Sequence, residues 1–332
     1  MAVNIRGMIC LVSLVIFSQL CVSQVTPSIR PFNLNRVRLT NSRWTENQDR
    51  TVTYLKFIDV ERLLYNFRAN HGVSTKGAAA LGGWDAPNFP FRTHMQGHFL
   101  TAWSYCYASL GDTVCRDRAL YFVAELAKCQ ARNGYLSGFP ESDFDLVEAR
   151  RLTNGNVPYY AVHKTMAGLL DVWQFFNDST ARDVLLKLAG WVESRTSKLN
   201  SSQMQAMLGT EFGGMNDVMA DIYHQTGDKR WLSLAQRFDH ASVFDPLASN
   251  IDRLDGLHAN TQVPKWIGAV KTYTGTGSSK YLNIARNAWN FTVNAHSYAI
   301  GGNSQGTFRS PNIRHCLNCL HSRNSRRGDK LT

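Results

Sequence analysis

Planar polar and aromatic side chains recur in four separated segments of this 332-residue chain, each leading into a predicted helix. The faces of Trp and Tyr can stack on sugar rings, while His, Asp and Glu can hydrogen-bond to sugar hydroxyls. Taken singly, each His or Asp is better explained as a helix cap or a satisfied polar residue, so the interpretation depends on the recurrence across the four segments. If the four segments meet in the fold, they predict a carbohydrate site. The candidate substrate-binding residues are Trp84, Asp85, His98, His163, Glu211, Asp217 and His258.

Some of these residues suggest catalytic or metal chemistry as well. Glu211 and Asp217 could form an acid/base pair of the glycosidase kind, but the sequence does not give the distance between their carboxyl groups. His94 and His98 are spaced i, i+4, as two ligands on one helical face would be. No third ligand accompanies them, so we expect no metal there. No nucleophile elbow, P-loop or dinucleotide fingerprint occurs, and the catalytic residues stay unassigned.

A repeated helical hairpin is the element that would position these residues. Met166, Leu169, Leu170 and Trp173 follow the i, i+3, i+4, i+7 spacing of an amphipathic helix, and a second such helix follows a short turn. The same plan occurs four times, preceded by a helix predicted across 46–67. Gly or Asn tolerates a positive φ where one helix ends, and Asp can cap the next helix. The predicted turns are 110–112, 177–179, 226–228 and 274–275.

Hairpins of this kind cannot bury their apolar faces alone, so they must stack, either as an open solenoid or as a closed ring. The long, irregular segments before each first helix favour the ring, because a ring gathers such loops at one mouth. We therefore predict an all-α fold, an (α/α) toroid of the (α/α)6 barrel type that is incomplete at the C-terminal end. The predicted domain spans 24–312, and the missing closure is expected to leave an apolar seam exposed.

The N-terminal segment predicts export. Residues 1–23 combine a basic residue, an apolar run and small residues before Gln24, as a signal peptide does. Three N-glycosylation triplets begin at Asn177, Asn200 and Asn290. We expect a secreted, extracellular glycoprotein with no membrane span once the leader is removed.

Cysteine content and charge restrict the chain further. Outside the leader five cysteines remain, an odd number that predicts no disulfide framework but leaves open one bridge among Cys106, Cys115 and Cys129. The net charge of +11 belongs partly to a short basic tail at 313–332, which we expect to be disordered. Elsewhere basic and acidic residues are interspersed, so we expect no nucleic-acid partner.

Six motifs together resemble glycoside hydrolase family 127, typified by β-L-arabinofuranosidases, over residues 32–312. The resemblance implies an (α/α)6 catalytic barrel and a retaining mechanism on L-arabinofuranosides. It also implies a zinc-bound cysteine thiolate as nucleophile and a glutamate as acid/base. His163 and His258 match positions of substrate contact in the family. The motifs are 81–85 (LGGWD), 97–102 (GHFLTA), 157–164 (VPYYAVHK), 211–217 (EFGGMND), 257–262 (LHANTQ) and 301–306 (GGNSQG).

The sequence departs from the family after the last motif. The acid/base glutamate is expected directly after 301–306, where this chain has Thr307, and a threonine cannot donate a proton as a carboxylic acid does. The expected Glu-x-Cys zinc motif is replaced by a stretch with Cys316 and Cys319 at a different spacing, flanked by His315 and His321. We attribute the difference to an altered C-terminus and expect no zinc or other cofactor in this chain.

These observations predict a secreted, glycoside hydrolase-like protein directed at L-arabinofuranosyl groups of plant-type glycans or glycoproteins, and inactive in this form. The alternative is a non-catalytic carbohydrate-binding or interaction protein built on the same helical ring.

Overall fold

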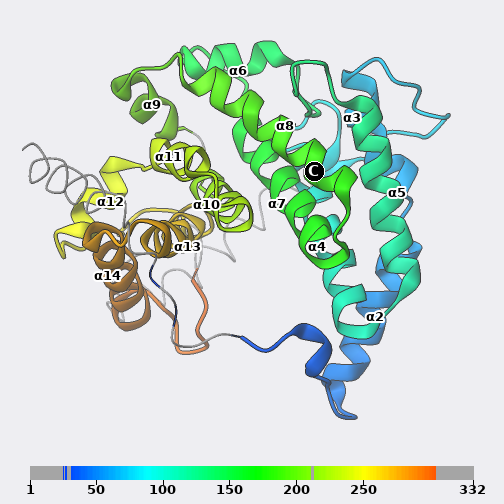
Figure 1. The fold of residues 1–332 in the computed structure, drawn as a ribbon, viewed down its shortest axis with the longest axis horizontal. Coiled ribbons are helices and arrows are strands. Elements are labelled where there is room, and N and C mark those ends of the chain that lie inside the picture. Colours follow the sequence, from blue (N-terminus) through cyan, green and yellow to red (C-terminus); the bar gives the residue numbers. More distant parts are fainter. Residues whose placement is uncertain (1–24, 26, 28–30, 211–212, 304–332) are drawn as a thin grey trace, which may run out of the picture.

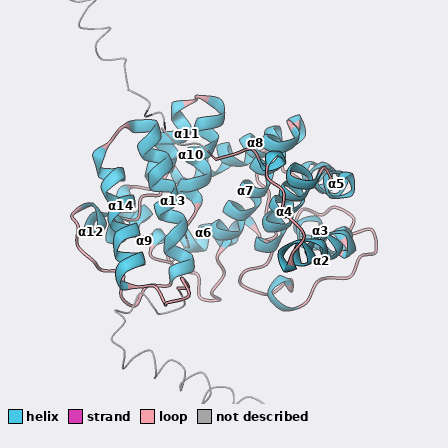
Figure 2. Ribbon diagram, turned by 90° about the horizontal axis from the view of Figure 1, so that it is seen from below, coloured by secondary structure: helices cyan, strands magenta, loops and turns pink. Residues whose placement is uncertain are grey.

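The computed structural model describes residues 25, 27, 31–210 and 213–303. In this part of the chain thirteen α-helices and two short 3-10 helices occur without any strand (Figure 2), which confirms the all-α prediction. The α-helices are α2 Arg43–Phe57, α3 Val60–Asn70, α4 His94–Leu110, α5 Thr113–Cys129, α6 Glu141–Glu148, α7 Pro158–Phe176, α8 Ser179–Thr196, α9 Ser201–Leu208, α10 Met215–Thr226, α11 Lys229–Arg237, α12 Ala241–Ala248, α13 Ala259–Thr276 and α14 Ser279–Ala295.

Four helical hairpins are formed by α4 with α5, α7 with α8, α10 with α11 and α13 with α14, as the repeat predicts. In the first three turns, a left-handed residue ends one helix and an aspartate caps the next. Asp112, for example, accepts the backbone N–H of Cys115. These turns are therefore specified by residues that can be recognised in the local sequence.

Three details of the element prediction are wrong. The leading helix predicted across 46–67 is two helices, because Asp59 caps a new helix and accepts the N–H groups of Glu61 and Arg62. The fourth turn lies at Gly277 rather than at 274–275. The segments that join the hairpins are not wholly irregular, since each contains a short helix, α6, α9 or α12.

The hairpins follow one another along an arc (Figure 1), from α2, α3 and α5 on one side to α12 and α14 on the other. Helices α4, α7, α10 and α13 pack against one another in sequence and form the inner row. Helices α5, α8, α11 and α14 each pack outside their own hairpin partner. Because every outer helix returns the chain, all four inner helices begin on the same face of the arc.

The tightest helix contact is between α4 and α7, and two glycines allow it. A Cβ on Gly97 would lie 1.8 Å from the carbonyl oxygen of Lys164, and a Cβ on Gly168 would lie 2.5 Å from the carbonyl oxygen of Gly97. Any side chain at these positions would force the helices apart. The close approach brings the first two turns of α4 and α7 together, and these turns carry several of the candidate residues.

The core continues through most of the arc. One cluster of buried apolar side chains extends from α2 to α11, and a second lies among α12, α13 and α14. A charged group is also buried in the first cluster: Arg68 of α3 is fully enclosed and pairs with Glu125 of α5. At both sides of the arc large apolar residues are exposed, among them Phe57 on α2 and Trp289 on α14. In the described part of the chain, no helix combines the length and apolar character that crossing a bilayer requires.

Candidate carbohydrate site

The loops that lead into the inner helices contact one another, as the ring prediction requires. The N–H of Val157, before α7, donates to the carbonyl of Pro90, before α4, at 3.2 Å. The N–H of Gly213, before α10, donates to the carbonyl of Thr261 in the first turn of α13, also at 3.2 Å. The loops are thus bonded in two pairs, and we call the surface at which α4, α7, α10 and α13 begin the mouth.

An aromatic cluster lies at the mouth beside α4 and α7. The ring of Trp84 stacks on Phe89 with 6.2 Å between centroids and lies 6.1 Å from the ring of His94. His94 in turn stacks on Tyr160 at 6.0 Å, which links the loop before α4 to α7. Trp84 remains 63% exposed although its neighbours fix it, so an open aromatic face is available at the mouth. Such a face is what the apolar side of a sugar ring stacks on.

Two histidines and a lysine from α4 and α7 adjoin this cluster. The ring centroids of His94 and His98 are 6.3 Å apart, and the ammonium of Lys164 lies 5.0 Å from the Tyr160 ring centroid. Burial lowers the pKa of His163, and the charge of Lys164 lowers it further. Desolvation and Lys164 likewise lower the pKa of His98, to about 4. Both imidazoles are therefore neutral at pH 7, and a neutral imidazole has one donor and one acceptor nitrogen. His163 is only 5% exposed and bonds to the backbone of Tyr160.

His163 is held from the side of α10 by a glycine. A Cβ on Gly214 would lie 2.1 Å from the imidazole carbon Cε1, so the ring rests directly on the backbone at the start of α10. Gly214 has φ 126°, a conformation that a residue with a side chain rarely adopts. Gly214 is thus needed for the position of the histidine as well as for the turn.

Asp217 extends the polar region onto α10 and α13. Its carboxylate pairs with the ammonium of Lys271 at 2.7 Å, and Asp221 one turn further pairs with the same lysine. Burial raises the pKa of Asp217, while Lys271 and Lys164 lower it and offset part of that effect. Asp217 therefore joins two inner helices, and Lys164 faces it from a third.

Asp85 and His258 hold the loops and helix ends around the mouth. The carboxylate of Asp85 is 7% exposed and accepts the backbone N–H of Thr93 at 2.9 Å, immediately before α4. His258 precedes α13 as its N-terminal flanking residue and accepts, through its carbonyl, the N–H and hydroxyl of Thr261. Asp85 orders the loop that carries Trp84, and contact of either residue with substrate stays a prediction.

The structure brings Trp84, Asp85, His98 and His163 together around α4 and α7. Asp217 is connected to this group through Lys164, and the loop before α10 bonds to the helix that His258 precedes. Glu211 and Thr307 lie outside the described residues, as does the tail 313–332 with its cysteines and histidines. The acid/base pairing of Glu211 with Asp217 is therefore untested.

Two lysines at the site were not predicted from the sequence. Lys164 directly follows His163 in a motif that was already singled out, so its place in that motif was a usable signal. Lys265 of α13 is only 4% exposed and donates to Gln262 at 3.0 Å, with its ammonium 2.7 Å from Nδ1 of His240. Its only signal was a single charge within the apolar stretch 263–267, which does not indicate burial.

A zinc–thiolate centre at the mouth does not fit the described residues. The cluster with a spacing suited to a metal ion, Cys106, Asp112 and Cys115, lies where α4 ends and α5 begins. From His98 to Cys106 the helix rises about 12 Å away from the mouth. Cys129 is buried in the core on outer helix α5. We therefore assign no zinc-dependent step to these residues.

Comparison with known proteins agrees with this architecture. A family model described as the β-L-arabinofuranosidase GH127 catalytic domain matches residues 36–315. A GH127 β-arabinofuranosidase of known structure is 18% identical, with a TM-score of 0.57, and the match covers 82% of this chain and 47% of that one. A GH127 β-L-arabinofuranosidase from Geobacillus stearothermophilus T6 is 14% identical, with a TM-score of 0.56, and the match covers 80% and 46%.

The two solved structures confirm the helical toroid fold, and this chain spans about half the length of each. A search of curated proteins finds no match. The family match, however, covers most of the chain, and four of the motifs from which the resemblance was drawn, 81–85, 97–102, 157–164 and 257–262, are described at or near the starts of the inner helices. This chain therefore belongs to glycoside hydrolase family 127, the β-L-arabinofuranosidase-like family.

Proposed function

We propose that this chain binds L-arabinofuranosyl groups of plant-type glycans or glycoproteins at the mouth and does not hydrolyse them. The observation that carries the proposal is the open face of Trp84, whose ring lies 6.1 Å from that of His94. His98 adjoins His94 at 6.3 Å, and Lys164 lies over the ring of Tyr160, on which His94 stacks. A furanose ring stacks its apolar face on the indole, and its hydroxyls take hydrogen bonds from the nearby polar groups. Lys164 donates only, whereas His98 can both donate and accept, which suits hydroxyl groups of either role.

The absence of hydrolysis is proposed from the sequence. Thr307 stands where the family resemblance expects the acid/base glutamate, and the family's zinc-binding motif does not follow it. Without a carboxylic acid, no group at that position can protonate the leaving oxygen. The related enzymes that the comparisons name contribute the substrate class to this proposal, because they are β-arabinofuranosidases.

Ligand-observed NMR with methyl β-L-arabinofuranoside tests the binding. We expect saturation transfer to the sugar with the native chain and its loss in Trp84→Ala. Trp289→Ala is the matched control, because Trp289 is similarly exposed, at 69%, but lies on outer helix α14. Equal binding by both variants, or none by the native chain, would refute a sugar site at Trp84.

Hydrolysis is tested separately with a nitrophenyl β-L-arabinofuranoside. We expect no nitrophenol release above the uncatalysed rate. Release that is lost on heat denaturation would show that another residue of this chain supplies the acid, and the non-catalytic part of the proposal would be wrong. Binding and hydrolysis are measured on the same preparation, so one result does not obscure the other.

Export is the third part of the proposal. The asparagines of all three glycosylation triplets, Asn177, Asn200 and Asn290, are exposed at the surface, as attachment of a glycan requires. Expression in a eukaryotic secretory host should place the chain in the medium with an apparent mass that falls after enzymatic deglycosylation. Retention inside the cell without glycans would contradict export.

A further inference from the structure

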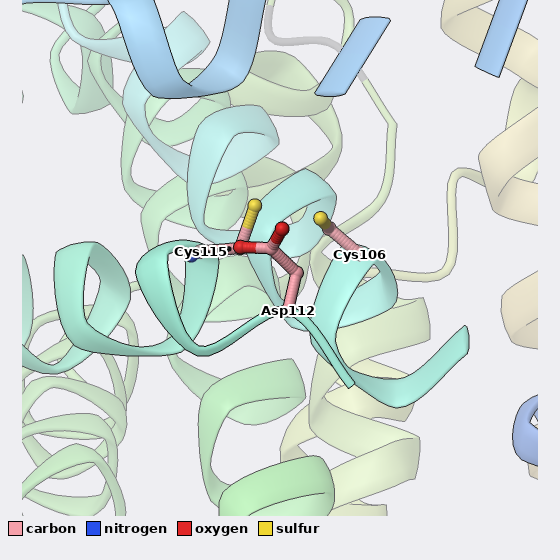
Figure 3. A group of neighbouring side chains, drawn as sticks. All are labelled: Cys106, Asp112 and Cys115. Atoms are coloured by element: carbon pink, nitrogen blue, oxygen red, sulfur yellow. Dashed lines mark hydrogen bonds between the residues drawn. The ribbon is translucent and has the colours of Figure 1, made fainter. Parts of the chain in front are cut away.

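The two cysteines at the first hairpin turn lie side by side (Figure 3). Cys106 is in the last turns of α4, and Cys115 is in the first turn of α5. Their sulfur atoms and the carboxylate of Asp112 between them all lie within 4.8 Å of one another. Both thiols are buried, with Cys106 7% and Cys115 0% exposed. Both are free thiols in this structure, and two thiols in such a position can form half of a metal site or a disulfide.

The surroundings of Asp112 disfavour a metal ion. One of its carboxylate oxygens accepts the Cys115 N–H at 3.0 Å, and the other pairs with the ammonium of Lys56. A divalent cation bound by the two sulfurs and this carboxylate would therefore lie next to a positive charge. Among the described residues the cluster contains three potential ligands, whereas structural zinc takes four. A disulfide is uncharged and leaves both interactions of Asp112 intact.

Cys129 does not compete for either partner. It lies fourteen residues after Cys115 on the same helix, a rise of about 21 Å. The Cα atoms of a disulfide are at most about 7 Å apart, so no bridge can join these two cysteines in the folded chain. Because the sulfur of Cys106 lies within 4.8 Å of that of Cys115, Cys106 is out of reach of Cys129 as well. The possibilities that the sequence left open among three cysteines are thus reduced to one pair and one free thiol.

We propose that Cys106 and Cys115 form a disulfide that fastens α4 to α5 across the turn 110–112. In its formation the two thiols lose two protons and two electrons, and an S–S bond replaces two S–H bonds. The oxidant is another disulfide, that of an isomerase or of oxidised glutathione, which is cleaved and reduced to two thiols. Bonded sulfurs are about 2 Å apart, so the two sulfur atoms must move closer together for the bridge to close.

The bridge should form while the chain folds. Burial raises the pKa of both thiols in the folded hairpin, so little thiolate is available there for exchange. We therefore expect fast oxidation during refolding and slow oxidation of the folded, reduced protein. The presence of the bridge in the cell depends on the proposed export, because reducing compartments keep thiols free.

Refolding in a glutathione buffer of secretory-pathway poise tests the bridge independently of export. The thiols are then alkylated without reduction and the peptides are mapped by mass spectrometry. We expect Cys106 and Cys115 in one cross-linked peptide that is two hydrogens lighter, and Cys129 alkylated. Alkylation of both hairpin cysteines, a bridge to Cys129, or stoichiometric zinc released by denaturation would overturn the proposal.

The same map of the chain recovered from a secretory host separates the two proposals. A bridge formed in glutathione by a chain that is not exported would leave the disulfide standing and refute export. Reduction should lower the thermal midpoint of the native chain by about 5 °C, the effect of opening a ten-residue loop. Cys129→Ala should keep this redox-dependent shift, and Cys106→Ala should lose it. A shift of the same size in Cys106→Ala would also overturn the proposal.

Discussion

Replacing Gly214 by alanine should destabilise the protein through a specific contact with His163. The added methyl group would lie 2.1 to 2.2 Å from the imidazole atoms Cε1 and Nε2, well inside van der Waals contact. Displacing a packed side chain in this way costs about 1–3 kcal/mol. The backbone at φ 126° adds about 1–3 kcal/mol for a residue with a Cβ. We expect a total loss of about 4 kcal/mol in the free energy of unfolding.

Gly227→Ala is the matched control at the other end of the same helix. Gly227 also has a positive φ, 74°, but a Cβ there would meet nothing within 4 Å. Only the backbone cost applies, about 1–2 kcal/mol. Urea unfolding followed by tryptophan fluorescence measures both variants, and the difference between them contains the contact with the imidazole together with any difference in backbone strain.

A double substitution tests the cause. His163→Ala removes the ring, so adding Gly214→Ala to it should cost about 1–3 kcal/mol less than adding it to the native chain. If the two substitutions are additive, or if Gly214→Ala costs no more than Gly227→Ala, the ring does not rest on the start of α10. The described arrangement of the mouth would then be wrong at this point.

Three further predictions concern packing and buried charge. Gly97→Ala should lower the free energy of unfolding by at least about 3 kcal/mol or prevent folding, because its Cβ would lie 1.8 Å from a backbone oxygen of α7. The control Gly190→Ala has open space at its Cβ and should stabilise α8 by about 0.5–1 kcal/mol, and urea unfolding curves of both variants measure the two effects. Burial lowers the pKa of Lys265 to about 8, below the unfolded value of about 10.4. The free-energy cost of burying the charged ammonium is therefore full below pH 8 and disappears as the pH rises to about 10.5. The free energy of unfolding of Lys265→Met should therefore exceed that of the native chain by up to about 3 kcal/mol at pH 7 and equal it at pH 10.5. A stabilisation that does not change with pH would show that the buried charge is not its cause. Burial raises the pKa of Glu125, but hydrogen bonds from its cationic partners, Arg68 among them, lower it to about 2, so its contribution to stability is present above pH 4.3 and lost as the pH falls toward 2. Glu125→Gln should be less stable than the native chain by about 3 kcal/mol at pH 7, and this difference in the free energy of unfolding should narrow below pH 4. A difference that stays constant with pH would refute the role of the Glu125 charge.

Much of the fold could be predicted because its signals are local. An aspartate that follows a left-handed residue ends one helix and starts the next within three residues, so the turns at 110–112, 177–179 and 226–228 were visible in the sequence. The i, i+3, i+4 pattern gave the helices between them. The break at Asp59 was missed because apolar periodicity continues on both sides of it, although a capping residue was present.

The site could be predicted only in part, because its residues meet through the curvature of the helix arc. The motifs indicated that Trp84 and His163 belong to one site, and the resemblance to a known family named the substrate class.

The sequence by itself determined the helical hairpins, the order in which they follow one another and the family to which the chain belongs. Only the tertiary structure decided that Asp217 pairs with Lys271, that Cys106 lies beside Cys115, and that Lys265 is buried. Apolar periodicity and turn residues determine structure over a few neighbouring residues, so they can be recognised in the local sequence. Pairings between helices depend on how closely two backbones approach, and that distance is set by residues such as Gly97 and Gly168 only once both helices are in place.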